Sequence, residues 1–94
     1  MDKIKIRSLG DTNIVQYLSS SDYKDRMVGE ALELGYRIHK LEVMLDKTPE
    51  ERGFEFTTPR HLLEAQLETM RALSRIFSIR ATLENVEIPE VDYD

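Results

Sequence analysis

The chain contains no cysteine, which excludes disulfides, thiolate metal ligands and cysteine nucleophiles. It also lacks any apolar run near the roughly 20 residues that a helix needs to span a bilayer. The first ten residues, MDKIKIRSLG, do not contain the apolar core of a signal peptide. We therefore expect a cytoplasmic protein with no contact to a membrane.

An excess of basic residues is also missing, because 18 Asp and Glu outnumber 13 Lys and Arg, for a net charge of -5. This balance argues against general binding to a nucleic-acid backbone, but a local arginine cluster could still hold a small anion. At 94 residues the chain has room for one domain, whose core is marginal unless association buries further surface. The 33% of charged residues is typical of long helices with solvated outer faces.

The pattern of residues predicts a single all-α domain over 1–94, built as an antiparallel two-helix hairpin that oligomerises through its helices. Ile4 and Ile6 alternate with charged residues and predict a brief extended arm, and Asp11 or Thr12 could cap a short helix. The tail is expected to be extended or loose. The predicted segments are an N-terminal arm with a short helix (1–21), a first helix (22–47), a loop (48–57), a second helix (58–85) and the tail (86–94).

The first long helix carries a heptad pattern. Its apolar residues recur at 4-3-4-3-4 spacing and predict one continuous contact stripe: Met27, Ala31, Leu34, Ile38, Leu41 and Leu45. A second stripe comprises Val28, Leu32 and Gly35. Glycine costs about 1 kcal/mol relative to alanine inside a helix. Gly35 therefore indicates either the close approach of another helix or a gap that faces a ligand.

The run Lys47-Thr48-Pro49 ends the first helix, since the residue before a proline avoids the helical region. Phe54 and Phe56 could fold back to plug the end of the hairpin or form an exposed contact patch. Thr58 followed by Pro59 predicts an N-cap and first residue of the second helix.

The second helix is apolar over too wide an arc for one neighbour to cover. One face carries Leu63, Leu67, Met70, Phe77 and Ala81. A neighbouring face carries Leu62, Leu73, Ile76 and Leu83, while Ile79 falls on neither. Because two helices cannot bury both faces, the pattern favours self-association, with the N-terminal segment as a partial cover.

Residues suited to catalysis are scarce. The two histidines, His39 and His61, have no histidine at i+4 and no glutamate three residues before them, so neither fits a zinc-protease or carboxylate-metal motif. There is no glycine-rich phosphate loop and no nucleophile elbow. We expect no enzymatic activity, no cofactor and no metal.

Cationic and aromatic residues carry the functional prediction. Arg71 and Arg75 stand at i,i+4 with Arg80 one turn further, and the first helix carries Lys24, Arg26, Arg37 and Lys40. Arginine forks and aromatic rings bind nucleotides and phosphates, although the same residues also suit a solvated helix face. The candidate ligand contacts are Tyr17, Tyr23, Arg26, Arg71 and Arg75, and Tyr36 is a further ring near these cations.

Two segments resemble phage anti-CBASS sponge proteins. They are LELGYRIHKL (32–41) and RHLLEAQLETMRALSR (60–75). The segments YKDRM (23–27) and FTTP (56–59) are also similar to small proteins of crAss-like phages. The resemblance implies a helical hairpin that assembles as a homo-oligomer, in that family a hexamer, and sequesters a cyclic nucleotide immune signal. Val28 stands where that family's first helix has a lysine, so no ligand contact is transferred by motif.

Three functions follow as hypotheses. The first is a phage anti-defence protein of the host cytoplasm that binds a cyclic oligonucleotide or a cyclic ADP-ribose without turnover. The second is a protein–protein interaction module that inhibits or adapts a host protein. The third, mimicry of DNA by the acidic surface, ranks last because 13 Lys and Arg interrupt that surface.

Overall fold

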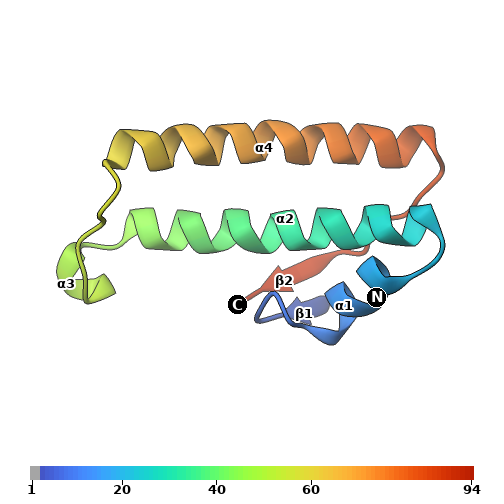
Figure 1. The fold of residues 1–94 in the computed structure, drawn as a ribbon, viewed down its shortest axis with the longest axis horizontal. Coiled ribbons are helices and arrows are strands. Elements are labelled where there is room, and N and C mark those ends of the chain that lie inside the picture. The colour runs from blue at the N-terminus through green and yellow to red at the C-terminus, as the bar shows by residue number, and fades with distance from the viewer. Residues whose placement is uncertain (1–2) are drawn as a thin grey trace.

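The computed structural model describes residues 3–94, so the first two residues of the predicted arm, 1–2, lie outside the described residues. Two long helices, α2 (Tyr23–Asp46) and α4 (Arg60–Leu83), form an antiparallel hairpin (Figure 1). The smaller elements are β1 (Ile4–Ile6), α1 (Thr12–Ser19), α3 (Pro49–Arg52) and β2 (Val91–Tyr93). Figure 1 shows α1 and both strands beside α2, on the side away from α4. The helical hairpin is therefore present as predicted, and α2 is the middle layer of the molecule.

The described residues are mostly helical, as the all-α prediction expects, and they add one two-stranded parallel sheet that it did not include. Strand β1 pairs with β2, with Ile4 opposite Val91 and Ile6 opposite Tyr93. Backbone hydrogen bonds of 3.0 Å from Ile4 N to Glu90 O and from Asp94 N to Ile6 O extend the pairing. The alternating arm is extended as expected, and part of the tail is extended too, as the paired strand Val91–Tyr93. The two strands come from opposite ends of the chain, so no local pattern could indicate that they meet.

The best-buried core lies between α2, α1 and the sheet. Ile6, Ile14, Val28 and Leu32 form one cluster, in which Ile6 is fully buried. The second stripe of α2 thus faces α1 and the strands, not α4. Gly29 lies against Leu18 of α1. A Cβ added at Gly29 would lie 2.9 Å from atoms of Leu18.

Gly35 lies beneath the side chain of Tyr93. A Cβ at Gly35 would overlap the Tyr93 hydroxyl, and that hydroxyl donates a hydrogen bond of 3.1 Å to Leu32 O. The close neighbour is therefore the C-terminal strand, and neither a helix nor a ligand gap is needed to explain the glycine.

Side-chain caps fix the starts of the two N-terminal helices. Asp11 accepts a hydrogen bond of 2.9 Å from Asn13 N, and Asp22 accepts one of 2.9 Å from Lys24 N. These bonds satisfy backbone donors that a helix start leaves unpaired. On the α4 side of α2, the buried heptad residues Met27, Leu34 and Leu45 form the contact stripe that the spacing predicted.

The predicted loop 48–57 contains the short helix α3. Thr48 and Glu51 form a reciprocal capping box, and Gly53 ends the helix with a positive φ of 85°. That conformation suits glycine because it has no Cβ. The predicted cap at Thr58 is wrong, since Pro59 occupies the N-cap position of α4 and no side chain caps this helix.

Candidate functional site

A groove between α2 and α4 combines cations, an aromatic ring and apolar side chains. Its volume is ≈ 330 Å³, near the lower end of the roughly 300–1,000 Å³ typical of small-molecule sites. It is called the cationic groove below. Its lining residues are Leu9, Tyr36, Arg37, Lys40, Leu41, Met44, Gln66 and Met70.

Among the described residues 3–94, no carboxylate lines the cationic groove. Lys40 Nζ lies 5.6 Å from the ring centroid of Tyr36, and Arg37 Nε lies 3.6 Å from a carboxylate oxygen of Glu33. The Tyr36 hydroxyl donates a hydrogen bond of 3.0 Å to Arg7 O, which helps to fix the ring. An anion could therefore approach two positive charges beside a fixed aromatic ring, with the Gln66 amide opposite.

A second groove of ≈ 490 Å³ lies near the closed end of the hairpin, and it is acidic. Its lining comprises Glu42, Val43, Leu45, Asp46, Arg60, Glu64, Leu67 and Arg71. Arg71 Nη2 lies 2.9 Å from Glu42 and Nη1 lies 3.1 Å from Glu68. The hydrogen bond to Glu42 is the main cause that raises the pKa of Arg71 above its ordinary value. An anion in this groove would compete with three carboxylates, so the cationic groove is the better anion site although it is smaller.

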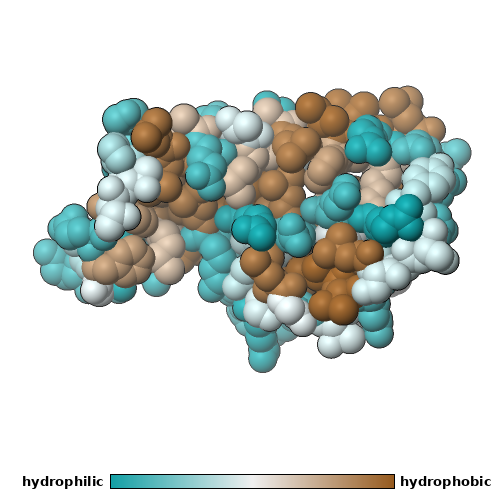
Figure 2. All heavy atoms as spheres, in the orientation of Figure 1, coloured by the Kyte–Doolittle hydropathy of each residue, from teal (hydrophilic) through white to brown (hydrophobic). Residues whose placement is uncertain are grey.

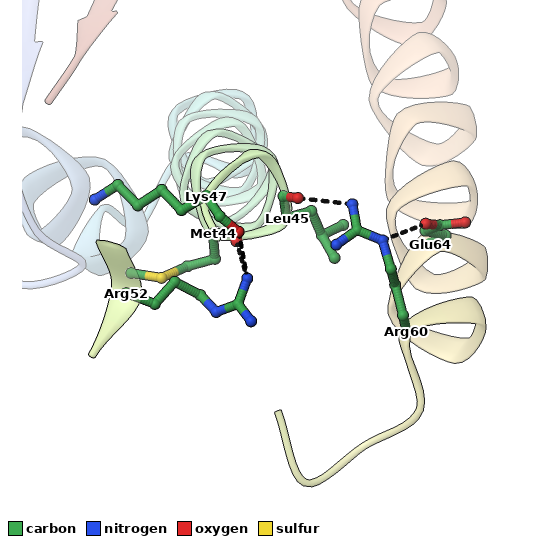
Figure 3. A network of polar contacts seen from close by, with 6 residues as sticks. All are labelled: Met44, Leu45, Lys47, Arg52, Arg60 and Glu64. Carbon is green, nitrogen blue, oxygen red and sulfur yellow. Dashed lines mark hydrogen bonds and ion pairs between the residues drawn. The ribbon is translucent and has the colours of Figure 1, made fainter. Parts of the chain in front are cut away.

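Two arginines of the second half of the chain cap the C-terminus of α2 (Figure 3). Arg52 donates to the carbonyl oxygens of Met44 and Lys47, and Arg60 donates to that of Leu45 at 2.7 Å. The last turn of α2 contains no basic residue of its own. Arginines on last-turn carbonyls satisfy unpaired acceptors and oppose the negative end of the helix dipole. We assign both arginines to the hairpin's architecture.

Phe54 and Phe56 surround the Arg52 guanidinium. Its central carbon lies 4.0 Å from the ring centroid of Phe56 and 5.8 Å from that of Phe54. The two rings meet edge to face at 5.8 Å. Phe56 is partly covered, whereas Phe54 is 50% exposed. The pair thus packs on the arginine that closes the hairpin and leaves one ring facing solvent.

The predicted contacts Tyr17, Tyr23 and Arg26 lie at the other end of α2. Tyr17 packs its ring against the core cluster. Tyr23 donates a hydrogen bond of 3.0 Å to Glu84, which is the main cause that raises the pKa of its hydroxyl. Arg26 donates one of 2.9 Å to Ser20 O. Each of these side chains therefore has a contact within its own chain.

Arg71 and Arg75 lie one turn apart on α4, near the acidic groove. Arg71 is held between two glutamates, whereas Arg75 is exposed and forms no hydrogen bond or ion pair with any residue of the described range 3–94. Within one chain Arg71 and Arg75 thus lie near the middle of α4, apart from the group Tyr17, Tyr23 and Arg26 at the start of α2. Whether any of them binds a ligand stays a prediction.

The pairing of Tyr36 with Lys40 was not assigned to a site from the sequence. Their i,i+4 spacing was a usable signal, because residues four apart share a helix face. His39 stacks on Tyr93, with ring centroids 6.1 Å apart. Among residues 3–94, no three His, Cys, Asp or Glu side chains gather as a metal site. In the same range no helix is long and apolar enough to cross a membrane.

A family model described as Sequestin matches residues 21–83. This range runs from the turn before α2 to the last residue of α4, and so contains the hairpin and most of the cationic groove. No curated protein and no solved structure matches the chain.

Proposed function

Because the chain belongs to the Sequestin family, we propose that it is a non-catalytic phage anti-defence protein that sequesters a nucleotide-derived immune signal. The proposed ligand is a cyclic oligonucleotide or a cyclic ADP-ribose, bound in the host cytoplasm. The family match carries the proposal, since the name Sequestin implies that a molecule is sequestered. The sequence resemblance to phage sponge proteins points to the same class of ligand.

The cationic groove supports this proposal as a binding site. Phosphates are held by charge-assisted hydrogen bonds, which Lys40 and Arg37 can donate. A nucleobase can stack on an aromatic ring such as Tyr36, and the Gln66 amide can pair with a base edge. The apolar floor of Leu41, Met44 and Met70 matches the mostly apolar lining of small-molecule sites.

Calorimetric titration with a panel of cyclic dinucleotides, cyclic trinucleotides and cyclic ADP-ribose isomers tests the function. We expect saturable binding of at least one compound. The bound compound should then be recovered with unchanged mass after the protein is denatured. An absence of heat for the whole panel would overturn the proposal, and a changed mass would overturn its non-catalytic part.

Substitutions locate the site. Lys40→Ala should weaken binding by about tenfold or more, since a charge-assisted hydrogen bond contributes about 1.5–3 kcal/mol. Lys5→Ala is the matched control, because Lys5 is an exposed residue of β1 outside both grooves. Alanine variants of Tyr17, Tyr23, Arg26, Arg71 and Arg75 test the predicted contacts in the same titration. If Arg71→Ala weakens binding and Lys40→Ala does not, the ligand occupies the acidic groove, which Arg71 lines.

A second function, a module that binds a host protein, is favoured by one observation. The outward face of α4 exposes large apolar residues that nothing within residues 3–94 covers. Pull-down from a bacterial lysate tests this alternative by recovery of one stoichiometric host protein. The self-association that the sequence predicts is the competing explanation of the same face.

A further inference from the structure

The face of α4 that points away from α2 carries a second heptad. Its spacing of 3-4-3-4-3-4 is regular, and it includes Ile79, which fitted neither of the faces identified from the sequence. The seven positions are Leu62, Ala65, Thr69, Ala72, Ile76, Ile79 and Leu83. They are called the outer seam below.

The part of the chain that the structure describes, residues 3–94, leaves the outer seam largely uncovered. Its four large residues, Leu62, Ile76, Ile79 and Leu83, are between 52% and 76% exposed. Leu73, at its flank, is 40% exposed. In Figure 2 hydrophobic residues gather along the upper edge of the molecule, over α4. A heptad sustained along a whole helix is the pattern by which two helices pack knobs into holes.

The charges beside the outer seam indicate its orientation. Glu68 and Arg75 occupy the same flanking position in successive heptads. In an antiparallel pair of identical helices each such position faces its own kind, so Glu68 of one chain can meet Arg75 of the other, twice by symmetry. In a parallel pair Arg75 would lie beside Arg80 of the second copy, and the like charges would repel.

The same register satisfies two further conditions. Glu68 and Arg75 are equally far from the midpoint of α4, as are its first and last residues, Arg60 and Leu83. Pairing the charges therefore overlaps the two helices along their full length. It also sets one large residue against a small one, because Ile76 lies opposite Ala65 of the second copy.

The two flanking charges are available to a partner. The Glu68 side chain is 76% exposed although it contacts Arg71, and Arg75 has no partner within residues 3–94. From this geometry we propose that the occupant of the outer seam is a second copy of this chain, packed through an antiparallel α4–α4 contact. Leu73 of the second copy would then lie beside Gln66, at the edge of the cationic groove.

Sedimentation of the intact protein over a range of concentrations tests the contact, with circular dichroism to confirm that each variant folds. We expect reversible association through a dimeric step. Glu68→Arg and Arg75→Glu should each weaken it about tenfold, because each converts two attractive pairs into repulsive ones. The double exchange Glu68→Arg with Arg75→Glu should restore it. A monomeric wild type at every concentration would overturn the proposal, and the seam would then belong to another protein.

The absence of cysteine allows a direct test of orientation. In the antiparallel register Leu62 faces Ile79 of the second copy. Mixing Leu62→Cys protein with Ile79→Cys protein should therefore give a disulfide-linked heterodimer, whereas each variant alone should stay uncrosslinked. Crosslinking of each variant with itself would indicate a parallel pair and overturn the proposal.

Ser78→Asp adds a charge to α4 outside the seam and should leave association unchanged, whereas Ile76→Asp should abolish it.

Discussion

The two sides of α2 differ in how completely the chain buries them. Toward α1 and the sheet, the side chains of Ile6, Ile14 and Leu32 are at most 1% exposed. Toward α4, three of the six residues of the contact stripe are buried and the other three are half-buried, and nothing in residues 3–94 forms a further layer over the outward face of α4. An amphipathic helix needs one covered stripe, so a helix that is apolar on two faces signals a missing neighbour. The single chain therefore buries the side of α2 that faces α1 and the sheet, but it leaves the outward face of α4 exposed.

The covered side is also the side where distant parts of the chain meet. Strand β2 returns from the end of α4 to pair with β1, and its Tyr93 lies over Gly35 of α2. This contact covers the side of α2 that faces away from α4. The three predictions below test the contrast between this covered side and the open outer seam.

The largest expected effect belongs to Leu32→Ala. Removal of a fully buried leucine should lower the free energy of unfolding by about 2–5 kcal/mol, at any protein concentration. Ile79→Ala is the matched variant on the open side, and in dilute protein it should change stability by about 0.5 kcal/mol or less. Its effect should grow with concentration as the α4–α4 contact is lost. Urea unfolding of both variants at two concentrations measures this, and equal effects would contradict the contrast.

A smaller effect is expected for Gly35→Ala. Alanine improves helix propensity by about 1 kcal/mol, but its Cβ must displace Tyr93, and overpacking costs about 1–3 kcal/mol. We expect a net loss of stability by thermal unfolding, partly relieved by Tyr93→Phe in the same chain. Gly10→Ala is the control, because a Cβ there meets nothing within 4 Å. A stabilised Gly35→Ala variant would show that β2 does not lie on α2 in solution.

The smallest effect concerns Tyr93 at alkaline pH. Burial raises the pKa of Tyr93 above its ordinary 10.0. The folded chain therefore holds this proton to a higher pH than the unfolded chain. The stabilisation is complete below pH 10.0 and is lost as pH rises through the folded-state pKa.

Tyr93→Phe should remove this pH dependence, and the lost hydrogen bond to Leu32 O should cost about 0.5–1.5 kcal/mol at neutral pH. Urea unfolding at neutral and alkaline pH measures both terms. Tyr23→Phe is the exposed counterpart, and its effect should be smaller because water replaces the hydrogen bond to Glu84. An unchanged alkaline loss of stability in Tyr93→Phe would place the responsible group elsewhere.

Local patterns anticipated the helices well, because helix formation depends on neighbours within a turn. The Asp11 cap, the contact stripe of α2 and the end of that helix before Pro49 all agree with the structure. Helix α3 was missed because it is only four residues long, although Thr48 and Glu51 form its capping box. For the candidate site, the sequence identified the cations but not which of them share a groove. That depends on how α2 and α4 pack side by side.

The sequence by itself determined the hairpin, the Asp11 cap and the excess of apolar surface on α4, since these follow from residues close together along one helix. Only the tertiary structure decided that the tail pairs with the N-terminal arm, that Gly35 makes room for Tyr93, and that Lys40 and Tyr36 line a groove without carboxylates. The physical reason is the distance along the chain between the residues that make contact. Spacing fixes which residues share a face, but contacts between distant segments depend on packing and loop geometry that no local pattern records.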